Sequence, residues 1–241
     1  MIARAPIVAL TLRGLLDRRR TWLMLALAAV PVLLVGLAAG FGDAQIEPAD
    51  FDSLIVQLVL PLIALVFGTA AIGSELEEGT IVYLLTKPIR RARIVASKGI
   101  VVAGLTAALI APAAILTGIV AGLTGNDVTS AGLAYGVAAA VGGAAYAMLF
   151  MAISTFTTRA LAIGLAYVML WEGVLADLLE GTRTFSIRQA TLAVARELAG
   201  ENPPEGAIAL EQGVFILVAV IVGAAAVATW RMSRYQIRGG D

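Results

Sequence analysis

Long apolar stretches separated by short polar ones dominate this chain. They recur at residues 21–40, 54–72, 99–123, 132–153, 160–176 and 212–230. Each approaches or exceeds the ~20 residues that a helix needs to cross a bilayer core. None alternates as a β-barrel strand would. The pattern predicts an all-α membrane protein with six transmembrane helices, and residues 1–241 are expected to form a single transmembrane domain.

Composition supports a membrane protein and excludes several kinds of site. The chain is 60% hydrophobic and 14% charged, whereas soluble domains average about 45–50% and about 25%. Its formal net charge is zero, so no overall field attracts nucleic acid. It has no cysteine and no histidine, which excludes a disulfide framework, a thiolate nucleophile and the usual zinc site. We therefore expect no metal site.

Lysine and arginine are distributed unequally between the two predicted faces. One face holds the N-terminal segment, the segment between the second and third spans, Arg159 and the C-terminal tail, and it carries most of these residues. The opposite face has only Arg183, Arg188 and Arg196. Since cytoplasmic loops are enriched in lysine and arginine, both termini are predicted to be cytoplasmic. The protein would be a multi-pass component of a bacterial cytoplasmic (plasma) membrane, the Ala/Arg/Gly/Val-rich composition favouring a GC-rich bacterium.

Residues 1–20 are predicted to form an amphipathic elbow helix that lies along the membrane. Arg4, Thr11 and Arg18 fall seven residues apart on one stripe. A second, apolar stripe consists of Val8, Leu12 and Leu15. This separation of polar and apolar faces is typical of an interfacial helix. The alternative is a frayed basic tail that only sets the topology.

The one long outer loop, residues 177–211, is predicted to contain a helix at 187–199. Ser186 and Gln189 have the spacing of a capping box, and Gly200 is placed to end the helix. Packing against the roof of the bundle is the favoured interpretation. The alternative is a docking surface for an extracytoplasmic partner.

Glu172 is the ionisable residue that lies inside an apolar run. A carboxylate there is costly to bury, which makes it a candidate for a role in translocation. It lies near the outer end of the fifth span, so solvation or hydrogen bonding is an equal alternative.

Prolines and glycines inside the spans predict kinks and close helix contacts. Pro31, Pro61 and Pro112 should kink their helices. Three pairs have the GxxxG spacing, namely Gly36/Gly40, Gly118/Gly122 and Gly132/Gly136. Such pairs permit helices to approach closely, and packing within the chain is favoured over dimerisation.

The segment 73–98 is the long charged stretch between apolar runs. Glu75, Glu77 and Glu78 are expected to start a short cytosolic helix, because carboxylates favour the first turn. Ile81, Leu84 and Leu85 would share one face of that helix. Pro88 would end it. The face could fit a groove in another protein, and the alternative is a helix that rests on lipid headgroups.

No feature of the sequence indicates an enzyme. There is no GxxxxGK[ST] phosphate-binding loop, so the chain is not expected to hydrolyse nucleotide itself. It also has no serine elbow and no metal-binding cluster. We expect neither catalytic residues nor a cofactor in this chain.

The segment 73–98 resembles the signature of type 2 ABC transporter permeases, the six-span membrane subunits of ATP-driven exporters. The pattern is E-x-E-E-G-T-x-x-x-L-L-x-x-P-x-x-R-x-x-I-x-x-x-K. The matching residues are Glu75, Glu77, Glu78, Gly79, Thr80, Leu84, Leu85, Pro88, Arg91, Ile94 and Lys98. Their place between the second and third spans is the same as in that family, and the predicted topology is also similar.

The resemblance implies an exporter assembled from two permeases, a homodimer or a pair of close paralogues, and two copies of a separate ATPase that binds ATP and Mg²⁺. Segment 73–98 would be the coupling segment, its helix seated in a groove of the ATPase. Glu78, Gly79 and Thr80 would shape that helix, and Leu84 and Leu85 would anchor it. Arg90, Arg91 and Lys98 would hold the third span near headgroups or acidic ATPase residues. Spans two and five would line the path.

The apolar spans favour a hydrophobic or amphipathic substrate. One alternative is a mechanical relay of the same architecture that acts on an extracytoplasmic partner through 177–211. Another is an ion-driven secondary transporter, which should show internal repeats and charged residues at the midplane. A third is a membrane adaptor that binds without ATP-dependent movement.

Overall fold

The computed structural model describes residues 11–12, 15, 18–41, 46–77, 90–123, 128–175, 184–204 and 206–234. Within these ranges the chain is helical and contains no strand. The elements in order are α2 (Arg18–Phe41), α3 (Pro48–Phe51), η1 (Asp52–Val59), α4 (Leu60–Glu77), α6 (Arg91–Leu123), α7 (Thr129–Ser154), α8 (Ala160–Ala166), η2 (Tyr167–Leu175), α10 (Ile187–Ala199) and α11 (Leu210–Ser233). η1 and η2 are π-helical.

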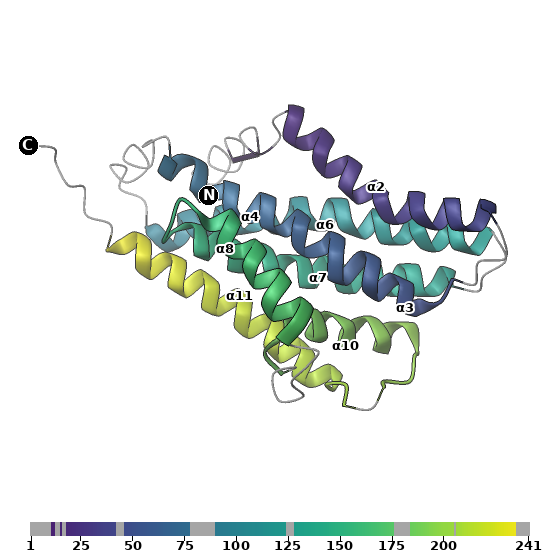
Figure 1. The fold of residues 1–241 in the computed structure, drawn as a ribbon. Coiled ribbons are helices and arrows are strands. Elements are labelled where there is room, and N and C mark those ends of the chain that lie inside the picture. The colour runs from purple at the N-terminus through teal and green to yellow at the C-terminus, as the bar shows by residue number, and fades with distance from the viewer. Residues whose placement is uncertain are drawn as a thin grey trace, which may run out of the picture.

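Helix α7 lies at the centre of the bundle. It packs against α4, α6, α10 and α11, which surround it in Figure 1. In the most apolar 18-residue stretch of each helix, 72% of the residues are buried for Ala49–Gly73 and 67% for α7. The corresponding share is 22% for both α2 and α11. The second and fourth apolar runs therefore form the core, whereas α2 and α11 present apolar side chains outward, as lipid-facing helices do.

Among the described residues, five helices are long and apolar enough to cross a membrane, and they correspond to five of the six predicted spans. They are Arg20–Ala38, Ala49–Gly73, Arg91–Leu123, Thr129–Ser154 and Leu210–Ser233. The predicted fifth span at 160–176 corresponds to α8 and η2, a shorter apolar helix over Ala160–Val174. It packs against α4 and α7. The count of six spans stays a prediction, because the residues that follow Leu175 lie outside the described ranges.

Glycines bring α6 and α7 into contact at backbone distance. A Cβ atom added to Gly118 would lie 2.7 Å from the Gly132 Cα, and one added to Gly132 would lie 2.8 Å from the Gly118 Cα. The Gly136 position is closed by Ile115, and the Gly122 position by Thr129. The pairs Gly118/Gly122 and Gly132/Gly136 therefore serve packing within the chain, as favoured from the sequence, whereas at Gly40 of the pair Gly36/Gly40 nothing lies within 4 Å of an added Cβ.

A long π-helical stretch precedes the proline of the second span. η1 ends at Val59, and Pro61 is the second residue of α4. Because proline donates no backbone hydrogen bond, the preceding turn must rearrange, and a π-bulge is one way to do so. Pro31 and Pro112 lie inside α2 and α6, which continue past them.

The ends of the helices divide into two groups. The end of α4 and the starts of α6 and α8 lie at the same end of the bundle as the end of α11 (Figure 1). α10 and α3 lie at the other end (Figure 1). This grouping agrees with the division of charge in the sequence. Most of the predicted elbow helix lies outside the described residues, but Leu12 and Leu15 pack against the core.

We predict that Gly118→Ala lowers the free energy of unfolding by about 1–3 kcal/mol, because the methyl group would overlap the Gly132 backbone. Gly104→Ala on the same helix is the matched control, since nothing lies within 4 Å of its added Cβ. Thermal unfolding in detergent, followed by tryptophan fluorescence, compares the two variants. Equal midpoints would contradict the close packing of α6 and α7.

Candidate functional site

The Glu172 carboxylate lies at the start of α10 and is fully engaged there. Oε1 accepts hydrogen bonds from the Tyr167 hydroxyl at 2.9 Å and the Ile187 N–H at 3.0 Å. Oε2 accepts from the Ser186 hydroxyl at 2.5 Å and the Arg188 N–H at 3.4 Å. The residue is only 2% exposed. This geometry favours the hydrogen-bonded alternative for Glu172 over direct contact with a substrate.

The bonds from Ile187 and Arg188 explain why a carboxylate is tolerated here. The first N–H groups of a helix have no partner within the helix and carry partial positive charge. Ser186 satisfies one of them by accepting from the Gln189 N–H at 3.0 Å. Glu172 satisfies two more from fourteen or more residues earlier in the chain. α10 spans Ile187–Ala199 and ends at Gly200 with a positive φ of 70°, as the sequence predicts.

A second link ties α10 to the start of the second span. Asp52 lies 3.4 Å from Arg188 Nε and 3.6 Å from Arg196 Nη2. The two arginines are separated by about two helical turns, so one carboxylate holds a length of α10. α10 therefore packs as a roof on the bundle, against α7 and α11, and the packing interpretation of this helix is confirmed.

Glu201 follows α10, and the charges of Arg196 and Asp52 influence the pKa of its carboxyl. Burial raises the pKa of the Glu201 carboxyl above its ordinary value, and Arg196 opposes that rise. A raised pKa in the folded protein means that the contribution of Glu201 to stability is largest when the carboxyl is protonated in both states. That contribution is lost as pH rises through the folded pKa.

At the opposite end of the bundle, the structure corrects the start of the coupling segment. Glu75 and Glu77 were expected to begin a new helix, but they lie in the last turns of α4. Gly73 does not end α4, because a single glycine costs only about 1 kcal/mol and the flanking residues continue the helix. Arg91 likewise begins the long helix α6, which includes Lys98.

Lys98 is buried and connects the two helices that flank the segment. Its side chain is 2% exposed, and Nζ donates to the Ala71 carbonyl at 2.5 Å. The expectation that it contacts headgroups or an ATPase is wrong, because α4 packs against α6 at this depth and covers it. Arg90 is exposed and Arg91 half-buried. The remaining predicted coupling residues, Glu78, Gly79, Thr80, Ile81, Leu84, Leu85 and Pro88, lie outside the described residues.

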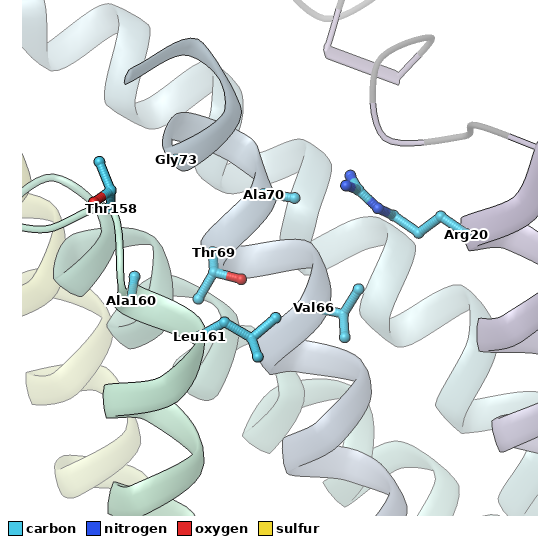
Figure 2. Close-up of a pocket in the computed structure, with 8 residues that line it drawn as sticks. All are labelled: Arg20, Val66, Thr69, Ala70, Gly73, Thr158, Ala160 and Leu161. Carbon is cyan, nitrogen blue, oxygen red and sulfur yellow. The ribbon is translucent and has the colours of Figure 1, made fainter. Parts of the chain in front are cut away.

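A cavity of about 220 Å³ opens near this same end, between α2, α4 and α8. Its lining residues are Arg20, Val66, Thr69, Ala70, Gly73, Thr158, Ala160 and Leu161. In Figure 2 the Arg20 side chain reaches from α2 toward Ala70 and Thr69 of α4, while Leu161 and Ala160 close the side formed by α8. The lining of the cavity therefore combines one cationic side chain with mostly apolar residues.

Sequence reasoning missed three parts of these sites. Asp52 carried a signal, because it is an acid at the start of the second apolar run, at the predicted membrane face that also holds Arg188 and Arg196. Lys98 carried a weaker one, as a lysine at the start of an apolar run. The cavity at Arg20 had none, because its residues come from three separate runs.

We predict that Glu172→Gln loosens α10, because an amide nitrogen would replace one of the two accepting oxygens. Leaving buried donors unpaired costs about 1–3 kcal/mol, roughly a 5- to 150-fold faster local opening. Hydrogen–deuterium exchange over 187–199 measures it. Glu197→Gln, at an exposed position of α10, should leave exchange unchanged. Unaltered exchange in Glu172→Gln would show that the carboxylate does not hold this helix.

Comparison with known proteins places this architecture in a family. The family described as ABC-2 family transporter protein matches residues 16–178, more than half of the 241 residues. The match extends from the start of the first span past η2 and includes the whole segment 73–98. No curated protein sequence matches the chain. With its apolar helices and its charged segment between the second and third spans, the chain belongs to the ABC-2 family of transporter membrane proteins, as the motif in 73–98 indicated.

Proposed function

We propose that this chain is the membrane subunit of an ATP-driven exporter for a hydrophobic or amphipathic substrate. ATP would be hydrolysed by a separate cytosolic subunit, bound in two copies beneath a pair of permeases. The pair would be two copies of this chain or this chain with a close paralogue. The observation that carries the proposal is the family match over residues 16–178, a range that includes the whole segment 73–98.

In this proposal the chain crosses a bacterial cytoplasmic membrane six times, with α8 and η2 as the fifth crossing and both termini in the cytoplasm. The grouping of helix ends in Figure 1 supports this topology, because the flanks of 73–98 lie with the end of α11. The segment would seat Ile81, Leu84 and Leu85 in the ATPase, and Arg90 and Arg91 would contact headgroups or acidic ATPase residues.

Lys98 supports a coupling role in a way that the sequence did not suggest. Its bond to the Ala71 carbonyl joins the end of α4 to the start of α6, so the segment is held at both of its bases. A push on the segment would move the two helices together, since neither base can slide without breaking a buried hydrogen bond. α4 borders α8, and these are spans two and five, which would line the path.

A mechanical relay is the second candidate, and the attachment of α10 favours it. Glu172 links α10 to span five, and Asp52 links it to span two. Movement of those spans would therefore displace the outer roof and could act on an extracytoplasmic partner. An outer protein that co-purifies, together with ATP hydrolysis that no substrate stimulates, would favour the relay over export.

We predict that Leu84→Asp combined with Leu85→Asp releases the ATPase, because the two apolar side chains proposed to anchor the segment in the ATPase would become charged. Loss of such anchors costs at least about 2 kcal/mol, roughly thirtyfold in affinity. A mild-detergent pull-down from the native membrane, with mass spectrometry of what co-purifies, measures it. Thr86→Asp adds a charge without removing an anchor and should retain the ATPase. Equal recovery of the ATPase with the double variant would refute the coupling assignment.

We predict that Lys98→Met leaves the ATPase bound but weakens coupling, because the bond between α4 and α6 is lost while apolar volume is kept. Changes along a coupling network typically amount to about 0.5–2 kcal/mol. Substrate-stimulated ATP hydrolysis in the reconstituted complex should fall, with pull-down recovery unchanged. Arg93→Met, at an exposed position of α6, is the control. Stimulation at the wild-type level in Lys98→Met would exclude this role for Lys98.

A further inference from the structure

The cavity between α2, α4 and α8 has the charge of an anion-binding site. Arg20 supplies a permanently charged guanidinium with several donors. Among the described residues that line the cavity, none is acidic. Arg20 also forms no ion pair with any other residue that the structure describes. The charge at the mouth of the cavity is therefore positive and is not neutralised by the described part of the chain.

The remaining walls suit an apolar group more than a second polar one. Val66, Ala70 and Leu161 present aliphatic side chains to the cavity. Thr69 lies between them, but its hydroxyl donates within α4 to the Leu65 carbonyl at 2.7 Å. Arg20 is thus the charged donor for an anion, Thr158 adds a hydroxyl at the rim, and the rest of the wall is mainly apolar. This combination fits a molecule with one negatively charged end and an apolar remainder.

The cavity is large enough for only the charged end of such a molecule. A volume of about 220 Å³ corresponds to roughly seven water molecules at about 30 Å³ each, enough for a small headgroup but not for acyl chains. The chains would have to leave over the rim, where Leu161 is 52% exposed on α8. Ala162 and Ile163, the next two residues of α8, are also exposed. An apolar tail would therefore lie along α8, on the side that faces lipid.

The rim of the cavity formed by the α7–α8 turn is held in place. The Thr155 hydroxyl donates to the Ala152 carbonyl at 2.7 Å, and the Arg159 N–H donates to the Thr157 hydroxyl at 3.1 Å. The Arg231 guanidinium lies 5.4 Å from the centre of the Phe156 ring. Thr158 is therefore presented from a turn fixed on both sides, and the cavity is formed before any ligand binds.

We propose that this cavity binds the phosphate-bearing headgroup of an anionic lipid from the cytoplasmic leaflet, with Arg20 as its counter-ion. The proposal rests on the proposed function, because α4 and α8 are the spans that would line the path and Arg20 of α2 lines the cavity beside them. It narrows the substrate class from apolar or amphipathic molecules to anionic amphiphiles that enter laterally between α2 and α8.

The test uses the full-length chain in nanodiscs of phosphatidylcholine, without any ATPase. Phosphatidylglycerol and phosphatidylcholine carrying the same photoreactive acyl chain are added at equal mole fraction, and crosslinks are mapped by mass spectrometry. We expect phosphatidylglycerol to label α4 and α8 about five- to tenfold more than phosphatidylcholine. Arg20→Gln should abolish this preference. Arg159→Gln, which removes an exposed arginine next to Thr158 but outside the cavity lining, should preserve it.

A second variant and a competitor keep the outcome decisive. Ala70→Leu narrows the cavity without changing charge and should also reduce the labelling by phosphatidylglycerol. Equal labelling by the two lipids in the wild type, or equal loss in Arg20→Gln and Arg159→Gln, would overturn the proposal. Competition by inorganic phosphate that removes the lipid preference would overturn it in favour of a free anion.

The result is independent of whether the chain is a permease. If the ATPase co-purifies but the lipid preference is absent, the site is refuted and the proposed function stands. If the preference depends on Arg20 but no ATPase co-purifies, the lipid site stands and export fails. The lipid site and the export function can therefore be refuted independently of each other.

Discussion

The end of the bundle that carries α10 depends on one buried carboxylate that satisfies the start of this helix. Glu172 accepts from two backbone N–H groups of α10, and Ser186 both donates to Glu172 and accepts from Gln189. A helix start buried without partners would be costly, and a buried carboxylate without partners would cost more. The hydrogen bonds between the carboxylate and the backbone N–H groups remove both costs together. Because Glu172 belongs to η2, the roof cannot be placed independently of that span.

The interior is governed by a different constraint, the distance between helix backbones. α7 packs most extensively against α4, α6, α10 and α11, and at Gly118 and Gly132 there is no room for a side chain. In a bilayer, where apolar side chains gain little by leaving lipid, such close contact supplies dispersion energy that bulkier residues could not. The same closeness buries Lys98 between α4 and α6, where a backbone carbonyl of the neighbouring helix replaces the water that its ammonium group would otherwise bind.

Periodicity, capping residues and charge distribution predict much of this architecture from the sequence. The long spans, the helix at 187–199 with its Ser186 and Gly200 ends, and the packing role of the Gly118 and Gly132 pair all follow from local rules. The predictions that were wrong concern one helix boundary and one long-range contact. Glu75 and Glu77 remain in α4 because no strong helix breaker precedes them, and Lys98 contacts Ala71 rather than headgroups. The partner of Glu172 could not be found from spacing, since it is set by how η2 meets α10.

The structure describes only part of the segment that carries the family motif. The motif in 73–98 indicated the family, which the match over residues 16–178 confirms, but most of its residues lie outside the described ranges. The cavity at Arg20 shows the converse case. Its residues follow no recognisable pattern along the chain, and only the packing of α2, α4 and α8 brings them together.

The bond between Lys98 and Ala71 has an evolutionary consequence. The hydrogen bond closes residues 71–98 into a ring. Both ends of this ring therefore stay fixed to the bundle, whatever residues lie between them. Substitutions within the ring can then alter its surface without disturbing the packing of α4 on α6. Such an arrangement would let the residues between positions 71 and 98 diverge in sequence while the helices of the bundle keep their packing.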